Sequence, residues 1–193
     1  MQTLIYKYTI DNHEELNKKI LDHLSIYKTK IGTHNWITFG ESHTHESSQA
    51  LPDGWNDKNI WDTQKWSHIA YKKMFLDAAE DKLHEHARLH IRPDITELDY
   101  QFNISHMWYH QMEYPNCISW HNHYPGCHWS GLYFVKVPDQ KYTEFLDPIT
   151  QKVIRPDVKE GDMVLFPSWM LHKAPMIDSG IKTVIAWNMD IRI

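Results

Sequence analysis

The pattern of apolar and polar positions divides the chain into a first half with helical periods and a second half of short strands. Residues 4–10 are rich in β-branched and aromatic side chains, which is typical of a strand. Apolar residues then recur at helical spacing from Asp11 to Tyr27 and again from Thr63 to about His90. Beyond Pro93 the pattern predicts six short strands, over residues 103–111, 117–123, 130–137, 143–146, 163–166 and 183–189.

Residues 32–62, between the two predicted helices, keep no period for long and are interrupted by glycine and proline. They predict a long loop with a short strand at 36–39, and loops of this length often carry binding or lid functions. His43 and His45 form a HxH pair within it, but their polar neighbours favour an exposed loop. The second predicted helix adds three histidines that we interpret as exposed: His84, His86 and His90.

Many short strands separated by turn signals predict an all-β barrel or a double-sheet roll, with the helices packed on its outside. No linker or repeat separates the two halves, so residues 1–193 are expected to form a single domain. Within it, residues 1–100 would supply a supporting strand, helices and the lid loop, and residues 101–193 the β core.

Charge and composition narrow the function classes. The net charge of −5 and the absence of Lys or Arg runs argue against a nucleic-acid partner. No run of about 18 apolar residues is present, so no membrane span is expected. The two cysteines, Cys117 and Cys127, form neither a disulfide framework nor a CxxC zinc signature. A reducing compartment is the simpler interpretation, and we expect a cytoplasmic protein.

The candidate chemistry lies in the second half. His121 and His123 are two apart on a predicted strand, so their imidazoles point to the same side. Imidazole is the commonest metal ligand and suits iron, zinc, copper and nickel. A lone HxH pair is a weak signal, but His172 ends the turn-and-strand run that starts at Gly161 and could supply a third ligand.

Lys182 opens the last predicted strand and shares one of its faces with Val184, Ala186 and Asn188. A lone cation on an otherwise apolar inward face would be costly unless it meets an anion. The alternative is that Lys182 is simply an exposed residue at the start of the strand, after Gly180.

These residues carry a resemblance to a known family. Residues 107–189 resemble the double-stranded β-helix core of the iron(II)- and 2-oxoglutarate-dependent oxygenases, and most of all the prolyl-4-hydroxylase-like group from phages and bacteria. The matching stretches, which cover nearly half of the chain, are 121–126, 130–138, 161–172 and 182–188. The resemblance implies a mainly β fold with flanking helices and a jelly-roll, cupin-like core. It also implies a dioxygenase that uses Fe(II), 2-oxoglutarate and O2.

The resemblance assigns roles to single residues. His121 and His172 fall on the two histidine ligands of the family, and His123 falls where most of the superfamily has an aspartate. Lys182 falls where a basic residue, usually arginine, pairs with the distal carboxylate of 2-oxoglutarate. Val184 stands where a hydroxyl residue often helps to hold that carboxylate, so we expect Tyr133 or Tyr109 to replace it, and Asn188 to orient the site.

The departure at His123 leaves alternatives open. A carboxylate from Asp147 or Glu144 could complete the metal sphere in its place. Three-histidine iron sites also occur in cupin-type dioxygenases that bind their substrate directly at the metal without 2-oxoglutarate. A third possibility is a non-catalytic roll whose histidines hold zinc or nothing.

The sequence says less about the substrate than about the fold and the cofactors. The resemblance implies a peptidyl substrate, prolyl among the candidates, or a small molecule, but fold and cofactor do not fix the substrate. The loop 32–62, with Trp36, Trp55 and Trp61, is the candidate lid over it. The alternative is a surface loop whose tryptophans pack on the core.

Overall fold

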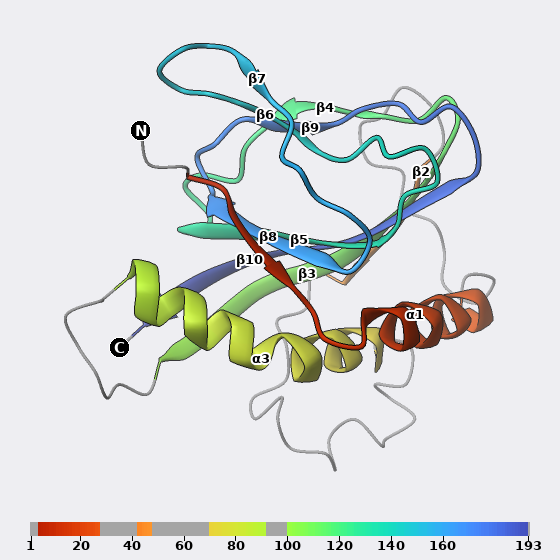
Figure 1. Cartoon of the computed structure of the whole chain (residues 1–193), viewed down its shortest axis with the longest axis horizontal. Coiled ribbons are helices and arrows are strands. Elements are labelled where there is room, and N and C mark those ends of the chain that lie inside the picture. Colours follow the sequence, from red (N-terminus) through yellow and green to blue (C-terminus); the bar gives the residue numbers. More distant parts are fainter. Residues whose placement is uncertain (1–3, 28–41, 48–69, 92–99, 193) are drawn as a thin grey trace.

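Two antiparallel sheets face each other, and two helices cover the outer face of the larger one (Figure 1). The computed structural model describes residues 4–27, 42–47, 70–91 and 100–192. In order across the larger sheet lie β1 (Tyr6–Thr9), β8 (Asp162–Pro167), β5 (Trp129–Lys136), β10 (Ile181–Arg192), β3 (Gln101–Glu113) and β2 (Ser42–Ser47). The smaller sheet has the order β4 (Ile118–His121), β9 (His172–Ala174), β6 (Glu144–Leu146) and β7 (Val153–Ile154).

The helices α1 (His13–Tyr27) and α3 (Ala70–His90) pack their apolar sides on the larger sheet. On α3 these sides include Phe75, Ala79 and Leu83, all fully buried, at the spacing of one helix face. Within the described residues, neither helix has the length and apolar character that crossing a membrane requires.

Strand β10 shows how the core is divided. Ile185, Trp187 and Met189 face the helices, whereas Val184 and Ala186 face the smaller sheet. Both faces of β10 are therefore buried, which explains why its sequence is a nearly continuous apolar run. The space between the two sheets is where the inward side chains of β10 and β3 meet those of β4 and β9.

The expected mainly β architecture with flanking helices is confirmed, and the six predicted strands are present with shifted ends. Two short strands of the smaller sheet, β7 and β9, were not predicted, because two or three residues carry no measurable period. The predicted helix from Thr63 begins at Ala70 in the described part. The strand expected at 36–39 and most of the predicted lid loop lie outside the described residues.

Two sequence interpretations of the first half of the chain are wrong. The segment Ser42–Ser47, predicted as an exposed loop, is strand β2, paired with β3 from Ser42↔Met112 to Ser47↔Met107. Its pairing comes from a distant strand edge, which local composition does not reveal. His86, predicted as exposed, is fully buried, and its Nδ1 lies 2.9 Å from the Tyr8 hydroxyl.

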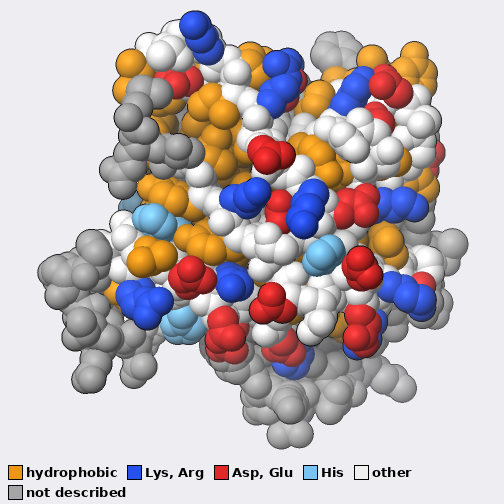
Figure 2. Space-filling model, viewed as in Figure 1, with side chains coloured by type: hydrophobic (Ala, Val, Ile, Leu, Met, Phe, Trp, Pro, Cys, Tyr) orange, Lys and Arg blue, Asp and Glu red, His pale blue; other side chains and the backbone are white. Residues whose placement is uncertain are grey.

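Charged side chains mix on the surface. On the face shown in Figure 2, the described Lys and Arg side chains are interspersed with Asp and Glu and form no continuous basic area. This distribution agrees with the net charge of −5.

Gly131 on β5 gives a testable prediction of stability. A Cβ at this position would lie 2.1 Å from Cε2 and Cζ2 of Trp187, whose side chain is fully buried. Gly131→Ala is therefore expected to lower the free energy of unfolding by about 1–3 kcal/mol through overpacking. Urea denaturation measures the change. Lys136→Ala, at the exposed end of the same strand, is the control and should shift stability by less than about 0.5 kcal/mol. Equal unfolding midpoints for the two variants would contradict this account of the packing.

Candidate metal centre

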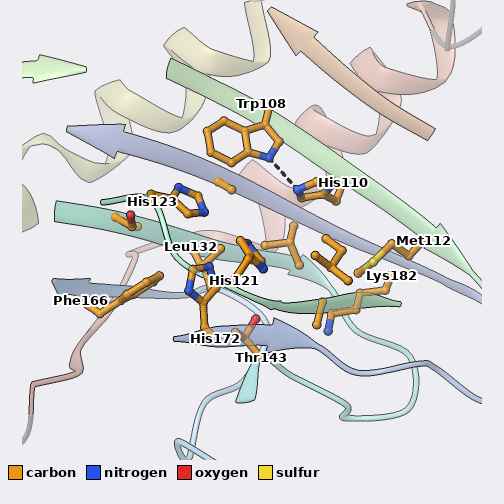
Figure 3. A pocket seen from close by; sticks show the side chains of 16 residues that line it. Trp108, His110, Met112, His121, His123, Leu132, Thr143, Phe166, His172 and Lys182 are labelled. Atoms are coloured by element: carbon orange, nitrogen blue, oxygen red, sulfur yellow. Dashed lines mark hydrogen bonds between the residues drawn. The ribbon is translucent and has the colours of Figure 1, made fainter. Parts of the chain in front are cut away.

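Three histidines converge at one end of the space between the sheets (Figure 3). His121 ends β4 and pairs directly with His172, which opens β9, so the two strands bring their imidazoles together. His123 follows in the turn after β4, where its backbone N–H donates to the carbonyl of Ser168 at 2.8 Å. The potential ligand atoms of the three side chains all lie within 4.8 Å of one another.

Hydrogen bonds set the tautomer of each imidazole. The Nδ1 of His121 lies 2.8 Å from the carbonyl oxygen of Ser119, and that of His172 lies 3.0 Å from the carbonyl oxygen of Met170. The Nδ1 of His123 lies 2.5 Å from Oδ1 of Asn188. Because all three partners are acceptors, each Nδ1 carries the proton and each Nε2 keeps a lone pair for a metal ion.

Asn188 thus contacts His123 through a hydrogen bond between the two side chains. Its Oδ1 also accepts a hydrogen bond from the Ser130 hydroxyl at 3.1 Å, so the same amide oxygen contacts both His123 and Ser130. Asn188 acts on the imidazole and is not among the residues that line the pocket.

The electrostatics of the site favour neutral imidazoles. Burial lowers the pKa of His121 and of His123 below the ordinary value for histidine. Burial, followed by the neighbouring His121, places the pKa of His172 well below that value. The three side chains are therefore neutral near pH 7, which is the form that binds a metal ion.

The donor set fits a divalent transition metal. Three neutral imidazole nitrogens on one side leave coordination positions open on the other, and imidazole suits iron, zinc, copper and nickel. Among the described residues, no carboxylate joins the group. Asp147 accepts hydrogen bonds from the backbone N–H groups of Ile149 and Thr150, at 2.8 and 2.9 Å.

Glu144, the other carboxylate considered for the metal sphere, is engaged on the outside of the smaller sheet. It pairs with Arg155 at 2.7 Å and with Lys173 at 3.0 Å. The structure therefore brings His123, and neither acidic alternative, to His121 and His172.

A pocket extends from the histidines to Lys182, which is fully buried (Figure 3). The interpretation of Lys182 as an exposed residue is therefore wrong. Its Nζ donates a hydrogen bond to the carbonyl of Lys141. Burial lowers the pKa of Lys182 to about 8, against the opposing effect of the negative charges of Asp139 and Glu144. Apolar side chains line most of the wall between the two ends, including Leu132, Phe166, Ala174, Val184 and Ala186.

Tyr133 and Tyr109, expected to help hold the co-substrate, do not line this pocket, and that expectation is corrected. The Tyr133 hydroxyl donates to Oδ1 of Asn17 on α1 at 2.6 Å. The ring of Tyr109 packs edge-on against Tyr71 on α3, with 5.4 Å between ring centroids. Strand alternation explains both positions. The chain neighbour of each tyrosine faces the pocket, so the tyrosine itself points to the opposite side of the sheet, which the helices cover.

Sequence reasoning missed several polar or aromatic residues of the pocket wall, among them Trp108, His110 and Thr143. The indole of Trp108 stacks on the imidazole of His123, with ring centroids 5.7 Å apart and planes inclined by 22°. Its Nε1–H donates to Nε2 of His110 at 2.6 Å. A usable signal existed, since Trp108 and His110 share the face of β3 that alternates away from Tyr109.

Comparison with known proteins relies on structure. No family model matches the sequence, and no curated protein does so either. A prolyl-4-hydroxylase from Pseudomonas putida matches with a TM-score of 0.63 and 10% identity, over 97% of this chain and 92% of that chain. A prolyl hydroxylase from Trichoplax adhaerens, in complex with a hypoxia inducible factor peptide, matches with a TM-score of 0.62 and 13% identity, over 97% and 84%.

HygX from Streptomyces hygroscopicus, with nickel and 2-oxoglutarate bound, matches with a TM-score of 0.61 and 9% identity, over 97% of this chain and 82% of that chain. These alignments span almost the whole chain, while the identities are too low to carry more than the architecture. The chain therefore has the fold of the 2-oxoglutarate- and iron(II)-dependent oxygenases, prolyl hydroxylases among them.

Proposed function

We propose that the protein is an Fe(II)- and 2-oxoglutarate-dependent oxygenase that hydroxylates a C–H bond of a peptidyl substrate, prolyl among the candidates, or of a small molecule. One observation carries the proposal: a single pocket has three convergent imidazole Nε2 atoms at one end and a buried ammonium at the other. A 2-oxo diacid matches this arrangement, because one end chelates a metal ion and the other end is an anion.

Some residues of the site would bind the metal, and others would orient these ligands. His121, His123 and His172 would hold the metal, and the carbonyls of Ser119 and Met170 with the amide of Asn188 would keep their Nε2 atoms in place. When bound, the metal, 2-oxoglutarate and O2 would supply the oxidation: 2-oxoglutarate would lose CO2 and take up one oxygen atom to become succinate, and the other oxygen atom would enter the substrate.

Lys182 would hold the distal carboxylate of the co-substrate. A buried lysine is costly without an anion, and the ion pair would offset that cost. The apolar wall between the two ends, with Leu132 and Val184, would exclude water from the chain of the bound diacid. The pocket is thus built for an elongated anion that reaches from the metal centre to Lys182.

The proposal is tested with the purified protein, Fe(II) and 2-oxoglutarate. Under argon, 2-oxoglutarate should bind the Fe(II)-loaded protein, as titration calorimetry measures. In air, succinate should form, at a rate that rises when the true substrate is added. A mass-spectrometric screen for products heavier by one oxygen atom, over peptides and small amines, then identifies the substrate. Iron binding without any 2-oxoglutarate binding would refute the proposal.

A second candidate function is a three-histidine metalloenzyme of the cupin type that binds its substrate directly at the metal. The absence of a carboxylate from the described histidine group favours it. So does Val184, which offers no hydroxyl beside Lys182. The titration with 2-oxoglutarate separates the two functions. The second candidate predicts that the metal-loaded protein does not bind 2-oxoglutarate.

A further inference from the structure

His110 lies in the pocket wall between Lys182 and the metal centre (Figure 3). In the pairing of β3 with β10, Met112 lies opposite Lys182 and His110 lies opposite Val184, the next inward-facing position toward the histidines. Among the β3 residues that line the pocket, His110 is thus the polar side chain nearest to the position opposite Lys182. Val184, its partner across the ladder, has no polar group to offer a ligand.

The hydrogen bond from Trp108 sets the protonation of His110. The indole Nε1–H can only donate, so Nε2 of His110 must accept and the proton of the neutral ring must lie on Nδ1. Burial lowers the pKa of His110 to about 3, with smaller contributions from His121, His123 and Lys182, so the ring stays neutral. The Nδ1 is buried and has no hydrogen-bond partner in the described part of the chain.

Buried N–H groups in native proteins are nearly always paired, so an unpaired one calls for an acceptor that binds there. A carboxylate has two oxygens that together accept several hydrogen bonds, more than one ammonium uses. Next to Lys182, an anion is also the acceptor that the local charge favours.

We propose that His110 is a co-substrate-binding residue whose Nδ1–H, held in this tautomer by Trp108, donates to the distal carboxylate of 2-oxoglutarate beside Lys182. The proposal rests on the proposed function and adds the second donor that Val184 does not provide. It also gives Trp108 two roles, since the same indole stacks on the metal-site residue His123 and orients His110.

Three substitutions of one residue separate the donor from the rest of the ring. His110→Asn places an amide N–H as many bonds from Cβ as Nδ1 and keeps a donor there. His110→Gln places its amide near the position of Nε2, so it keeps a partner for Trp108 and loses the Nδ1 donor. His110→Phe loses both. Affinities are measured by calorimetry on the Ni(II)-loaded, redox-inert proteins, after metal content and circular dichroism have shown that each variant is loaded and folded.

Two ligands locate the contact. 2-Oxopentanoate keeps the chelating 2-oxo acid of 2-oxoglutarate and has a methyl group in place of the distal carboxylate. We expect His110→Phe and His110→Gln to weaken 2-oxoglutarate binding by about tenfold, as loss of a hydrogen bond to a charged group would. His110→Asn should stay within about threefold of wild type. No variant should alter binding of 2-oxopentanoate.

Each other result overturns the inference in a different way. Unchanged 2-oxoglutarate affinity in His110→Phe means that Nδ1–H meets only water. Equal weakening of both ligands means that His110 acts on the metal centre through Trp108 and His123. If wild type binds nickel but neither 2-oxo acid, the proposed function itself falls, which the variants alone could not show.

Discussion

Replacing His172 with alanine is expected to weaken Fe(II) binding by at least about a hundredfold, because even residues that only support metal ligands are worth ten- to a hundredfold. His172 supplies one of three converging Nε2 atoms, and among the described residues only His121 and His123 join it in this ligand group. The iron retained after dialysis, measured by elemental analysis, and the loss of succinate formation are the two readouts.

The fold needs a separate check, because the His172 ring also packs edge-on against Phe166, with 4.8 Å between ring centroids. Its truncation should cost some stability without unfolding the chain, and thermal melting of the metal-free proteins measures this. His90→Ala is the matched control, since His90 is an exposed histidine on α3, across the larger sheet from the metal centre. Full iron content in His172→Ala would remove this residue from the metal site.

Local sequence patterns predict some residues of the site, whereas long-range contacts between strands determine the others. The spacing of His121 and His123 is a local signal, although β4 ends at His121, so strand alternation does not place His123 as predicted. The lone cation Lys182 on an apolar strand face is a local signal too. Both could be predicted from the sequence, and the structure brings these residues to one pocket. The third histidine could be proposed only by order along the chain, because its pairing with His121 is a long-range contact.

The errors have physical causes as well. The expectation for Tyr109 and Tyr133 rests on their hydroxyl groups, although strand alternation places Tyr109 and His110 on opposite faces of β3. Alternation along β3 places Trp108 and His110 on the face opposite to Tyr109, and the structure shows that this face lines the pocket. By contrast, the pairing of β2 with β3 depends on an unpaired strand edge, and no local pattern in Ser42–Ser47 encodes that partner.

Lys182→Ala is expected to weaken 2-oxoglutarate binding by about ten- to a hundredfold, because a charge-assisted hydrogen bond contributes roughly 1.5–3 kcal/mol. Metal binding should survive, since Lys182 lies at the opposite end of the pocket from the histidines. Lys182→Met keeps most of the aliphatic stem and should lose as much affinity, which separates the charge from the packing. Calorimetry with the Ni(II)-loaded protein measures both. Unchanged affinity would mean that the anion is held elsewhere.

The pKa of Lys182 adds a pH dependence with a definite sign. Burial lowers this pKa to about 8, while the charges of Asp139 and Glu144 oppose the shift. Only the ammonium form pairs with a carboxylate, so affinity for 2-oxoglutarate should be full below pH 8 and fall by about tenfold per pH unit above it. His110 and the three metal-site histidines are already neutral in this range and add no slope of their own.

Two controls isolate Lys182 in this experiment. Lys182→Arg remains charged throughout, because the guanidinium pKa exceeds about 12, and so its affinity for 2-oxoglutarate should be flat from pH 7 to 9.5, whatever its absolute value. In the wild type, 2-oxopentanoate lacks the distal carboxylate and should report only on changes at the metal ion itself. In the wild type, the ratio of the affinity for 2-oxoglutarate to the affinity for 2-oxopentanoate therefore follows the charge on Lys182. A ratio that stays constant through pH 8 in the wild type would show that the ammonium does not contact the co-substrate.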